Sequence, residues 1–468
     1  MANMRTIRLA LLVFGLSICA AAQTSSQSQS GATPAPAPAF GQTATVLDPD
    51  NPPVSGLDQP SLELHTASRS FISPALQVSE SADTNGANQL GGRPGLESVT
   101  RVLGALDLQQ FWPKSDLFLE YLGGGSFYSS PYAAKQMQAA GLEAVTRWRT
   151  GQVTLRDSFS YLPDGSFAVS AFGGVPGLGI ATGGGTAGLG GGALGVNPNG
   201  QLGAVGNIPR LSNRAIVDAV QAISKVSALT AAVGFSNAHF YDPSGTLLNS
   251  DEITVEGGYS HLLRRHDQIG VVYAFQLNQF PQVIGGQIYV QTANLRWSHT
   301  ITGRMSLMAG VGPQYVDLQN RGDFPHWSVS ARVQLRYKFA HSSMIASYEK
   351  FTSAGAGFFA GAETQAARLA FQRPLARTWN VFGDVGFSHN KRLQTVLFGV
   401  DAASYNDVFA GVIFRKHMGR TYDFFAAYRF SEVAFNVPVT LGGVTSRNNQ
   451  RQVGTIGVEW HPTPTRIE

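Results

Sequence analysis

The sequence predicts an all-β protein: a transmembrane, antiparallel, up-and-down β-barrel of eighteen strands, with sixteen strands as the alternative. Three observations lead to this fold class. Apolar and polar residues alternate with a period of two from about residue 68 to Trp460. No run of roughly 18 apolar residues, the length of a membrane-spanning helix, follows the N-terminal segment. Short and long connections alternate along the chain, as expected when one rim of a barrel carries turns and the other carries loops.

The composition fits a chain with one apolar face and one weakly charged polar face. Only 14% of the 468 residues are charged, 53 are glycine, and 10% are aromatic. The hydrophobic share of 43% excludes disorder throughout, and the mean hydropathy of −0.03 is too low for a helical membrane protein. The 34 Lys and Arg nearly balance the 30 Asp and Glu, so the charge argues against a nucleic-acid partner.

Residues 1–22 have the pattern of a secretory signal peptide. Arg5 and Arg8 precede an apolar core over Leu9–Ile18, and Ala20–Ala22 form an A-x-A cleavage site. An apolar run this short cannot cross the roughly 30 Å hydrocarbon layer as a helix. We therefore expect cleavage near Ala22 and export out of the cytoplasm.

A lipid anchor is the alternative at this end of the chain, because the residues before Cys19 resemble a lipobox. Ile18 stands where that motif has a small residue, so cleavage is the preferred interpretation. Cys19 is the only cysteine, and its removal would exclude disulfides, cysteine nucleophiles and cysteine metal sites. Residues 23–67, rich in Pro, Ser and Gln, are expected to form a disordered periplasmic segment.

The alternation is clearest over residues 327–339. Trp, Val, Ala, Val, Leu, Tyr and Phe occupy the odd positions, and Ser, Ser, Arg, Gln, Arg and Lys the even ones. Successive side chains of a strand point to opposite faces, so this segment has one apolar and one polar wall. Residues 268–279, 380–388 and 451–460 repeat the pattern. A soluble antiparallel sheet would alternate in the same way, so alternation alone does not decide the fold.

The connections between the patterned segments decide it. Nine long loops and eight short turns join eighteen strands, and the even number returns both termini to the periplasmic side. The weakest of these strands are the first two, near 68–80 and 98–111, and without them sixteen remain. The long loops are predicted at 81–97, 123–137, 162–210, 241–250, 280–286, 317–325, 353–362, 389–404 and 434–449. The short turns are predicted at 112–115, 150–152, 224–227, 264–267, 300–304, 340–342, 375–377 and 416–420.

The polar face carries charges of both signs, and it must face the lumen because a charge facing lipid would cost roughly 2–4 kcal/mol at mid-bilayer. Two interpretations are open: the charges pair across strands and hydrate the wall, or the arginines form a constriction that attracts anions. The candidate pore-lining residues are Arg296, Arg332, Arg336, Glu349, Arg368, Asp384 and Arg429. Aromatic residues near the predicted strand ends suggest membrane-interface girdles, although β-propensity also favours them there.

The loop at 162–210 contains a Gly-rich stretch, residues 173–206. It is predicted to be an external flap or, alternatively, a constriction folded into the lumen. Gly183–Gly188 matches G-x-G-x-x-G, but no strand precedes it and no helix follows, so the match reflects composition. The ten histidines show no H-E-x-x-H or ligand spacing, and no G-x-S-x-G occurs. No enzyme activity, cofactor or metal is predicted, although a hydrolase with distant catalytic residues would leave no motif.

Residues 68–460 resemble the porin-like outer-membrane β-barrel proteins of the Gram-negative envelope, through their architecture and through the segments SDLFLEYLGGGSFY and RDSFSYLPDGSF. The resemblance implies an outer-membrane location, surrounding lipid, and insertion by the barrel-assembly machinery. Such barrels usually end on an aromatic residue, whereas here residues 461–468 form a tail after Trp460. The expected function is passive passage of small hydrophilic solutes. The alternative is a closed barrel whose loops act as an adhesin or as an accessory of surface-polymer export.

Overall fold

The computed structural model describes residues 70–85, 95–129, 135–162, 209–241, 247–264, 266–302, 304–319, 325–339, 342–394, 401–441, 444–463 and 465–466. The predicted signal peptide, the Pro-rich segment and the Gly-rich stretch lie outside the described residues. Among the described residues, no helix is long and apolar enough to span a bilayer.

Eighteen long strands make up almost all of the described chain, and a two-residue strand follows them. The strands are β1 (Phe71–Asp83), β2 (Glu97–Phe111), β3 (Ser115–Tyr128), β4 (Lys135–Trp148), β5 (Gly151–Leu162), β6 (Arg210–Ala222), β7 (Ser227–Phe240), β8 (Ser250–Arg264), β9 (Asp267–Gln279), β10 (Gln287–Thr302), β11 (Met305–Leu318), β12 (His326–Lys338), β13 (Ser343–Ser353), β14 (Ala362–Ala376), β15 (Trp379–Arg392), β16 (Ser404–Met418), β17 (Tyr422–Leu441), β18 (Val444–Trp460) and β19 (Thr465–Arg466). One 3₁₀ turn, η2 (Gly355–Gly357), lies between β13 and β14.

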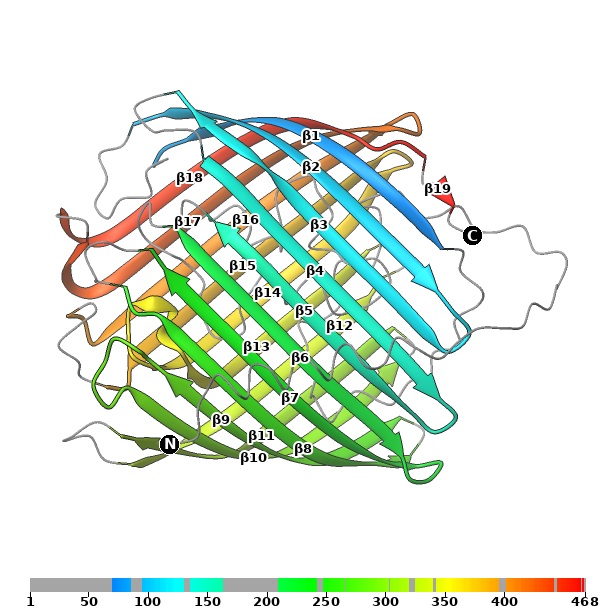
Figure 1. Cartoon of the computed structure of the whole chain (residues 1–468), viewed down its shortest axis with the longest axis vertical. Helices are drawn as coiled ribbons and strands as arrows, with labels where there is room; N and C mark the ends of the chain where they lie inside the picture. The colour runs from blue at the N-terminus through cyan, green and yellow to red at the C-terminus, as the bar shows by residue number, and fades with distance from the viewer. Residues whose placement is uncertain are drawn as a thin grey trace, which may run out of the picture. The chain divides into compact units, whose positions relative to one another are not determined.

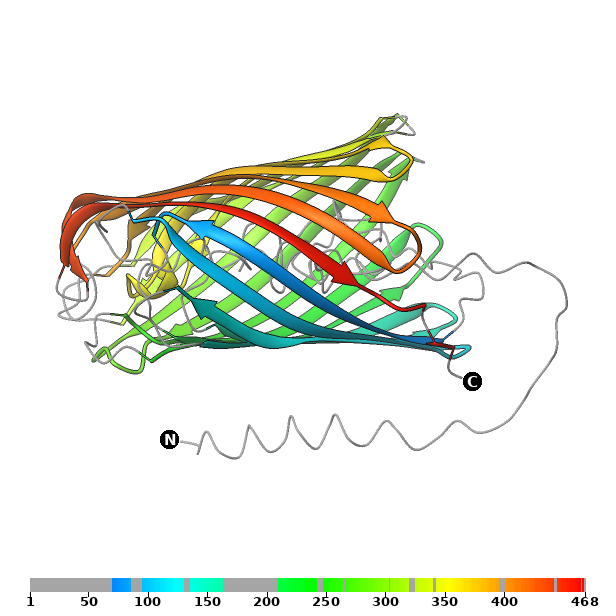
Figure 2. The same cartoon turned by 90° about the horizontal axis from the view of Figure 1, so that it is seen from above.

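The strands close into a single antiparallel barrel (Figures 1 and 2). Each of β1 to β18 pairs with its neighbours in sequence, and β1 closes the ring by pairing with β18 from Leu76↔Trp460 to Asp83↔Val453. β1 and β2 pair along their whole length, from Phe71↔Gln109 to Asp83↔Glu97. The eighteen-strand prediction is therefore confirmed, including its two weakest strands.

One end of the barrel carries the short turns, and the other carries the long connections together with the β17–β18 hairpin. The strand bounds leave two to four residues in each of the eight turns, and every turn overlaps its predicted range. The long connection predicted at 434–449 is wrong: β17 and β18 continue to Leu441 and Val444 as one extended hairpin. Its register shifts between Ala434 and Val439, where unpaired residues bend the hairpin. The sequence predicted a loop here because this irregularity interrupts the alternation and because residues 445–450 are polar and rich in Asn.

The two faces of the wall differ in the way the alternation predicts. On β12, Trp327, Val329 and Val333 are exposed on the outside, while Gln334 is buried on the inside. The same outward exposure of Val, Leu, Ile, Tyr and Trp recurs on strands around the barrel, including Leu295, Val311, Val385 and Ile456. A soluble protein rarely exposes an apolar surface this extensive. The outer surface is therefore suited to lipid.

The height of the apolar band agrees with a membrane. Trp327 and Tyr337 lie ten positions apart on β12. At about 3.3 Å per residue they are about 33 Å apart along the strand. With a strand tilt of roughly 40°, that becomes about 25 Å along the barrel axis, which is the height of the lipid-facing band of outer-membrane barrels.

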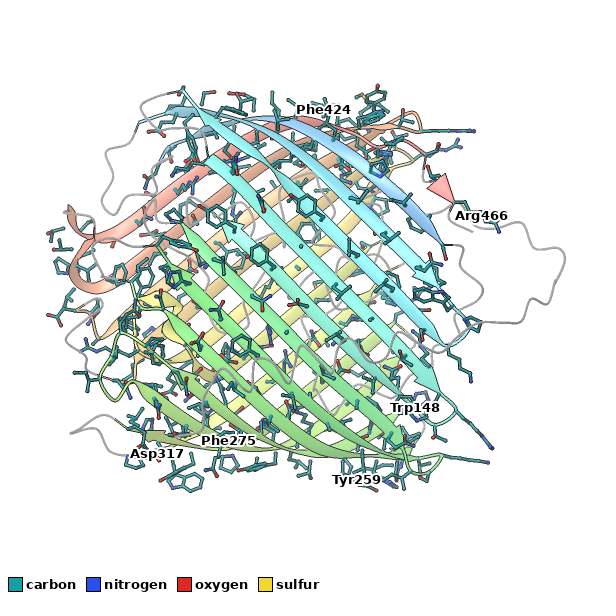
Figure 3. All side chains as sticks on the ribbon, in the orientation of Figure 1. Trp148, Tyr259, Phe275, Asp317, Phe424 and Arg466 are labelled. Carbon is teal, nitrogen blue, oxygen red and sulfur yellow. The ribbon has the colours of Figure 1, made fainter. Side chains whose placement is uncertain are left out.

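Aromatic side chains mark the end with the short turns (Figure 3). Trp148, Tyr259, Trp297, Tyr422 and Trp460 are each about 40–50% exposed and lie within a few residues of a turn or strand end. Lys416 Nζ lies 5.3 Å from the ring centroid of Trp379 at the same rim. This arrangement is typical of an interfacial girdle, in which amphipathic rings sit at the headgroup level.

The tail after Trp460 stays on the barrel. The pairing of β18 with β1 ends at Trp460↔Leu76, so β18 does not pair with the first residues of β1. β19 pairs with these residues, Phe71↔Arg466 and Ile72↔Thr465. His461 is buried, and its backbone N–H donates to the carbonyl of Thr421. The tail therefore continues the closure of the seam beyond the last long strand.

Candidate functional site

The inner wall between β8 and β13 carries two arginine–carboxylate pairs. Arg296 on β10 donates to Glu256 on β8 at 3.0 Å. Arg332 on β12 donates to Glu349 on β13 from Nη2 at 2.6 Å and from Nε at 2.9 Å. Gly310 on β11 stands in register between the two arginines, so no side chain separates their guanidinium groups from each other. Four charged residues that are far apart in sequence thus form one ladder.

A second ladder lies on the wall formed by β3 to β6. Arg156 on β5 is within 3.5 Å of Glu143 on β4 and 3.0 Å of Asp218 on β6. Arg147 on β4 forms an ion pair with the buried Asp116 on β3. The alternation places these side chains inside, and each carboxylate is nearly inaccessible to solvent. An unpaired charge would be costly there, so the cross-strand pairs stabilise the wall.

The seam between β1 and β18 has an ion pair of its own. Arg451 donates to both carboxylate oxygens of Asp83, with Nε at 3.1 and 3.0 Å. Both side chains are buried, with exposed fractions of 2% and 0%. Arg101 on β2 donates to the Ser81 hydroxyl beside this pair at 2.7 Å. The strands that close the barrel are thus joined by a charge-assisted bidentate contact as well as by backbone hydrogen bonds.

A further cluster lies near the short-turn end, on β16 to β18. Arg415 lies 3.3 Å from Glu459 and 3.6 Å from Asp423. His417 Nδ1 lies 2.6 Å from Asp423 Oδ1, and His461 Nε2 lies 3.6 Å from the same oxygen. The buried carboxylate of Asp423 therefore has three partners: Arg415 and His417 on β16, and His461, the first residue of the tail.

The other predicted pore-lining residues also lie on the barrel strands. Arg336 on β12 is in register with Ser306 and Ile345. Arg368 is on β14, and Asp384 is on β15, where the structure describes its backbone only. Arg429 on β17 is buried and interacts electrostatically with Asp407 on β16. The alternation assigns all of these positions to the face toward the lumen. Their effect on passing ions stays a prediction.

The described geometry favours pairing as the main chemical role of the wall charges. Arg147, Arg156, Arg296, Arg332, Arg415 and Arg451 each have a carboxylate partner on another strand. The planar guanidinium group suits such contacts because it presents several donors in a fixed fork. The partners were not predictable from the sequence, because pairing depends on strand register over long separations.

An apolar cluster at the rim with the long connections is the feature that the sequence analysis missed. Phe358 and Phe359, in the connection between β13 and β14, are buried with inward-facing side chains from other strands. Alternation predicts nothing within a loop. The available signal was an aromatic pair bounded by Gly355, Gly357 and Gly361, three glycines that each adopt positive φ.

No metal site is apparent in the described ranges: no group of three or more His, Cys, Asp or Glu side chains there is arranged to hold an ion.

Comparisons with known proteins place the fold in context. No protein-family model and no curated protein matches the chain. Among solved structures, Pseudomonas aeruginosa OccK5 (OpdH) aligns with 11% identity and a TM-score of 0.40, over 85% of this chain and 98% of the other. OpdK of the same organism, solved with vanillate, aligns with 10% identity and a TM-score of 0.40, over 84% and 98%.

A transporter from another organism also aligns. The FrpB iron transporter of Neisseria meningitidis has 8% identity and a TM-score of 0.39, over 84% of this chain and 82% of the other.

Proposed function

We propose that this protein is a porin-like channel of the Gram-negative outer membrane, through which small hydrophilic solutes pass passively. The observation that carries the proposal is the contrast between the two faces of one closed wall. The outside is a band of exposed Val, Leu, Ile and aromatic side chains, whereas the inside carries ion-paired arginines and carboxylates on many strands. A hydrated passage needs a polar lining of this kind.

The contrast between the apolar outside and the polar inside of the wall also supports a location in the outer membrane. The apolar band calls for outer-membrane lipid as the neighbour of the barrel. Residues 1–22 supply a signal peptide for export, with cleavage near Ala22. Insertion would depend on the barrel-assembly machinery, with Trp460 as the aromatic residue at the end of the last long strand. No catalytic step is part of this proposal.

Solute flux tests the function directly. Liposomes that contain the purified, heat-modifiable barrel should swell in isotonic solutions of small sugars, and swelling should slow as the sugar becomes larger. Liposomes prepared with heat-denatured protein are the control. Swelling equal to that control would contradict the channel and favour the alternative, a closed barrel that acts through its loops in adhesion or surface-polymer export.

A further inference from the structure

The connection between β13 and β14 folds toward the inside of the barrel at the rim with the long connections. Residues 354–361 run through η2 and continue into Phe358, Phe359 and Ala360, whose side chains are all buried. In Figure 1 this segment, drawn in yellow, lies within the end of the barrel among strands of other colours. A connection of eight residues thereby becomes part of the interior.

The aromatic pair packs on strands far from its own. The Phe358 ring meets Tyr405 of β16 and Phe435 of β17 edge-to-face, with both pairs of ring centroids 5.3 Å apart. Phe359 lies 5.4 Å from Tyr405, and the same cluster includes Phe240 at the end of β7. β7 and β17 are eight places apart around a ring of eighteen, close to opposite sides. The segment therefore bridges the rim.

A second apolar group lies under the same segment. Ala354 and Ala360 pack with Ile288 and Val290 of β10 and with Val316 of β11, all of which are almost fully buried. These β10 and β11 residues alternate with outward-facing ones and so belong to the inner face. An apolar inner face is unfavourable against water, so withdrawal of the segment would expose it.

Backbone contacts with neighbouring connections hold the segment at its middle and at its C-terminal end. The N–H of Leu248, just before β8, donates to the carbonyl of Gly357 at 2.8 Å, and the N–H of Leu393, just after β15, donates to Gly361 at 3.1 Å. Gly357 and Gly361 have φ of +84° and +81°. A Cβ at Gly361 would lie 2.3 Å from Ile288 Cδ1, and one at Gly357 would lie 2.7 Å from the Phe240 ring. Only glycine fits this conformation and this spacing.

From these contacts we infer that residues 354–361 are a permanent wedge, which covers the inner face of β10 and β11 and narrows the mouth, rather than a lid that swings open. A lid requires alternative states of similar free energy, whereas opening here would expose two apolar surfaces and break the backbone contacts at Gly357 and Gly361. The size limit that the wedge would set rests on the proposed channel function, but its permanence does not.

Thiol labelling tests the permanence without any need for transport. In a Cys19→Ser background the chain has no cysteine, so Val316→Cys and, separately, Ile288→Cys each introduce one thiol beneath the wedge. Asp401→Cys is the positive control, because the Asp401 side chain is fully exposed near the same rim. A membrane-impermeant maleimide is added to barrels in liposomes, and each variant is first shown to be folded by its heat-modifiable mobility.

The wedge predicts that both buried thiols label at least about 100-fold more slowly than the thiol at position 401. Adding Phe358→Ala with Phe359→Ala should then raise their labelling rate at least about tenfold. The matched control is Phe387→Ala, which removes an exposed outer phenylalanine of β15 and should leave the rate unchanged. Labelling at the rate of position 401 in the parent would overturn the wedge in favour of a lid. Slow labelling that persists in the double alanine variant would show that something else covers the wall.

The size limit has a separate readout. If the channel conducts, the double alanine variant should admit larger sugars than the parent in liposome swelling, and the Phe387→Ala variant should not. An unchanged size limit would contradict the narrowing. If neither parent nor variant conducts, the proposed function fails, while the labelling result still decides the permanence of the wedge.

Discussion

Arg332 and Glu349 face each other on adjacent strands, and two nitrogens of the arginine donate to one oxygen of the glutamate. The register Arg332↔Glu349 places them directly opposite, although seventeen positions separate them in sequence. A cationic residue on the inner wall is therefore accompanied by its counter-charge. Because the opposite charges of such a pair largely cancel, a solute in the lumen should meet only a weak electrostatic field.

This pairing leads to a prediction about ion selectivity. We expect the wild type to prefer anions weakly, with a preference that fades as salt rises and the Debye length falls below about 10 Å. Arg332→Ala with Arg336→Ala should reduce the preference, because Glu349 then keeps its charge without its partner. Glu349→Ala should shift it in the opposite direction. Reversal potentials in a salt gradient measure this. A cation-selective wild type, or identical potentials in all three proteins, would contradict the prediction.

The seam ion pair predicts a large effect on stability. Arg451→Ala leaves Asp83 buried without its bidentate partner, and loss of one member of a buried pair typically costs about 3–5 kcal/mol. The temperature at which the barrel loses its heat-modifiable mobility should fall markedly. Arg373→Ala, on an exposed part of β14, is the control and should change little. If both variants unfold at the wild-type temperature, the seam does not depend on this contact.

The C-terminal tail is also expected to stabilise the barrel. Deletion of residues 461–468 removes the β19 pairing with Phe71 and Ile72 and the buried imidazole of His461 near Asp423. The unfolding temperature should fall, and His461→Ala alone should cause part of the decrease. A truncated barrel that assembles and unfolds like the full chain would show that the tail is only an appendage.

The assignment of inner and outer faces can be tested by moving one charge. Val311→Lys places an amine on the exposed outer face of β11 near mid-span, where it should cost roughly 2–4 kcal/mol in a bilayer. Ser330→Lys, on the opposite face of neighbouring β12, should be tolerated much better. The free energy of unfolding in liposomes, measured by denaturant titration, distinguishes them. Equal losses would contradict the face assignment.

The sequence predicted most of the fold because the fold repeats a simple pattern. Alternation along one strand reports which side chains face lipid, and turn residues report where each strand stops, so all eighteen strands could be located. The predicted loop at 434–449 was wrong, because a register irregularity near Ala434 interrupts the alternation by which a strand is identified in the β17–β18 hairpin. The positions of the short turns could be predicted because they depend on local residues.

The candidate site was harder to predict because it depends on register. The sequence placed Arg296 and Arg332 on the inner face, but their partners Glu256 and Glu349 are determined by how strands shift past each other. The inward-folded segment at Phe358 left no periodic signal at all. Its position depends on apolar residues near the ends of β7, β10, β11, β16 and β17. In the sequence these residues look like any other apolar residue of a strand.

Planar-bilayer recordings of the full barrel, and of a variant without residues 173–206, the Gly-rich stretch, decide whether the lumen conducts ions. We predict stepwise, ohmic currents from the full barrel, with equal or larger steps from the deletion variant if the Gly-rich stretch narrows the passage. Currents from the variant alone would indicate a channel closed by that stretch. Absence of current from both proteins, each shown to be folded and inserted, would contradict the channel and favour a barrel that acts only through its loops.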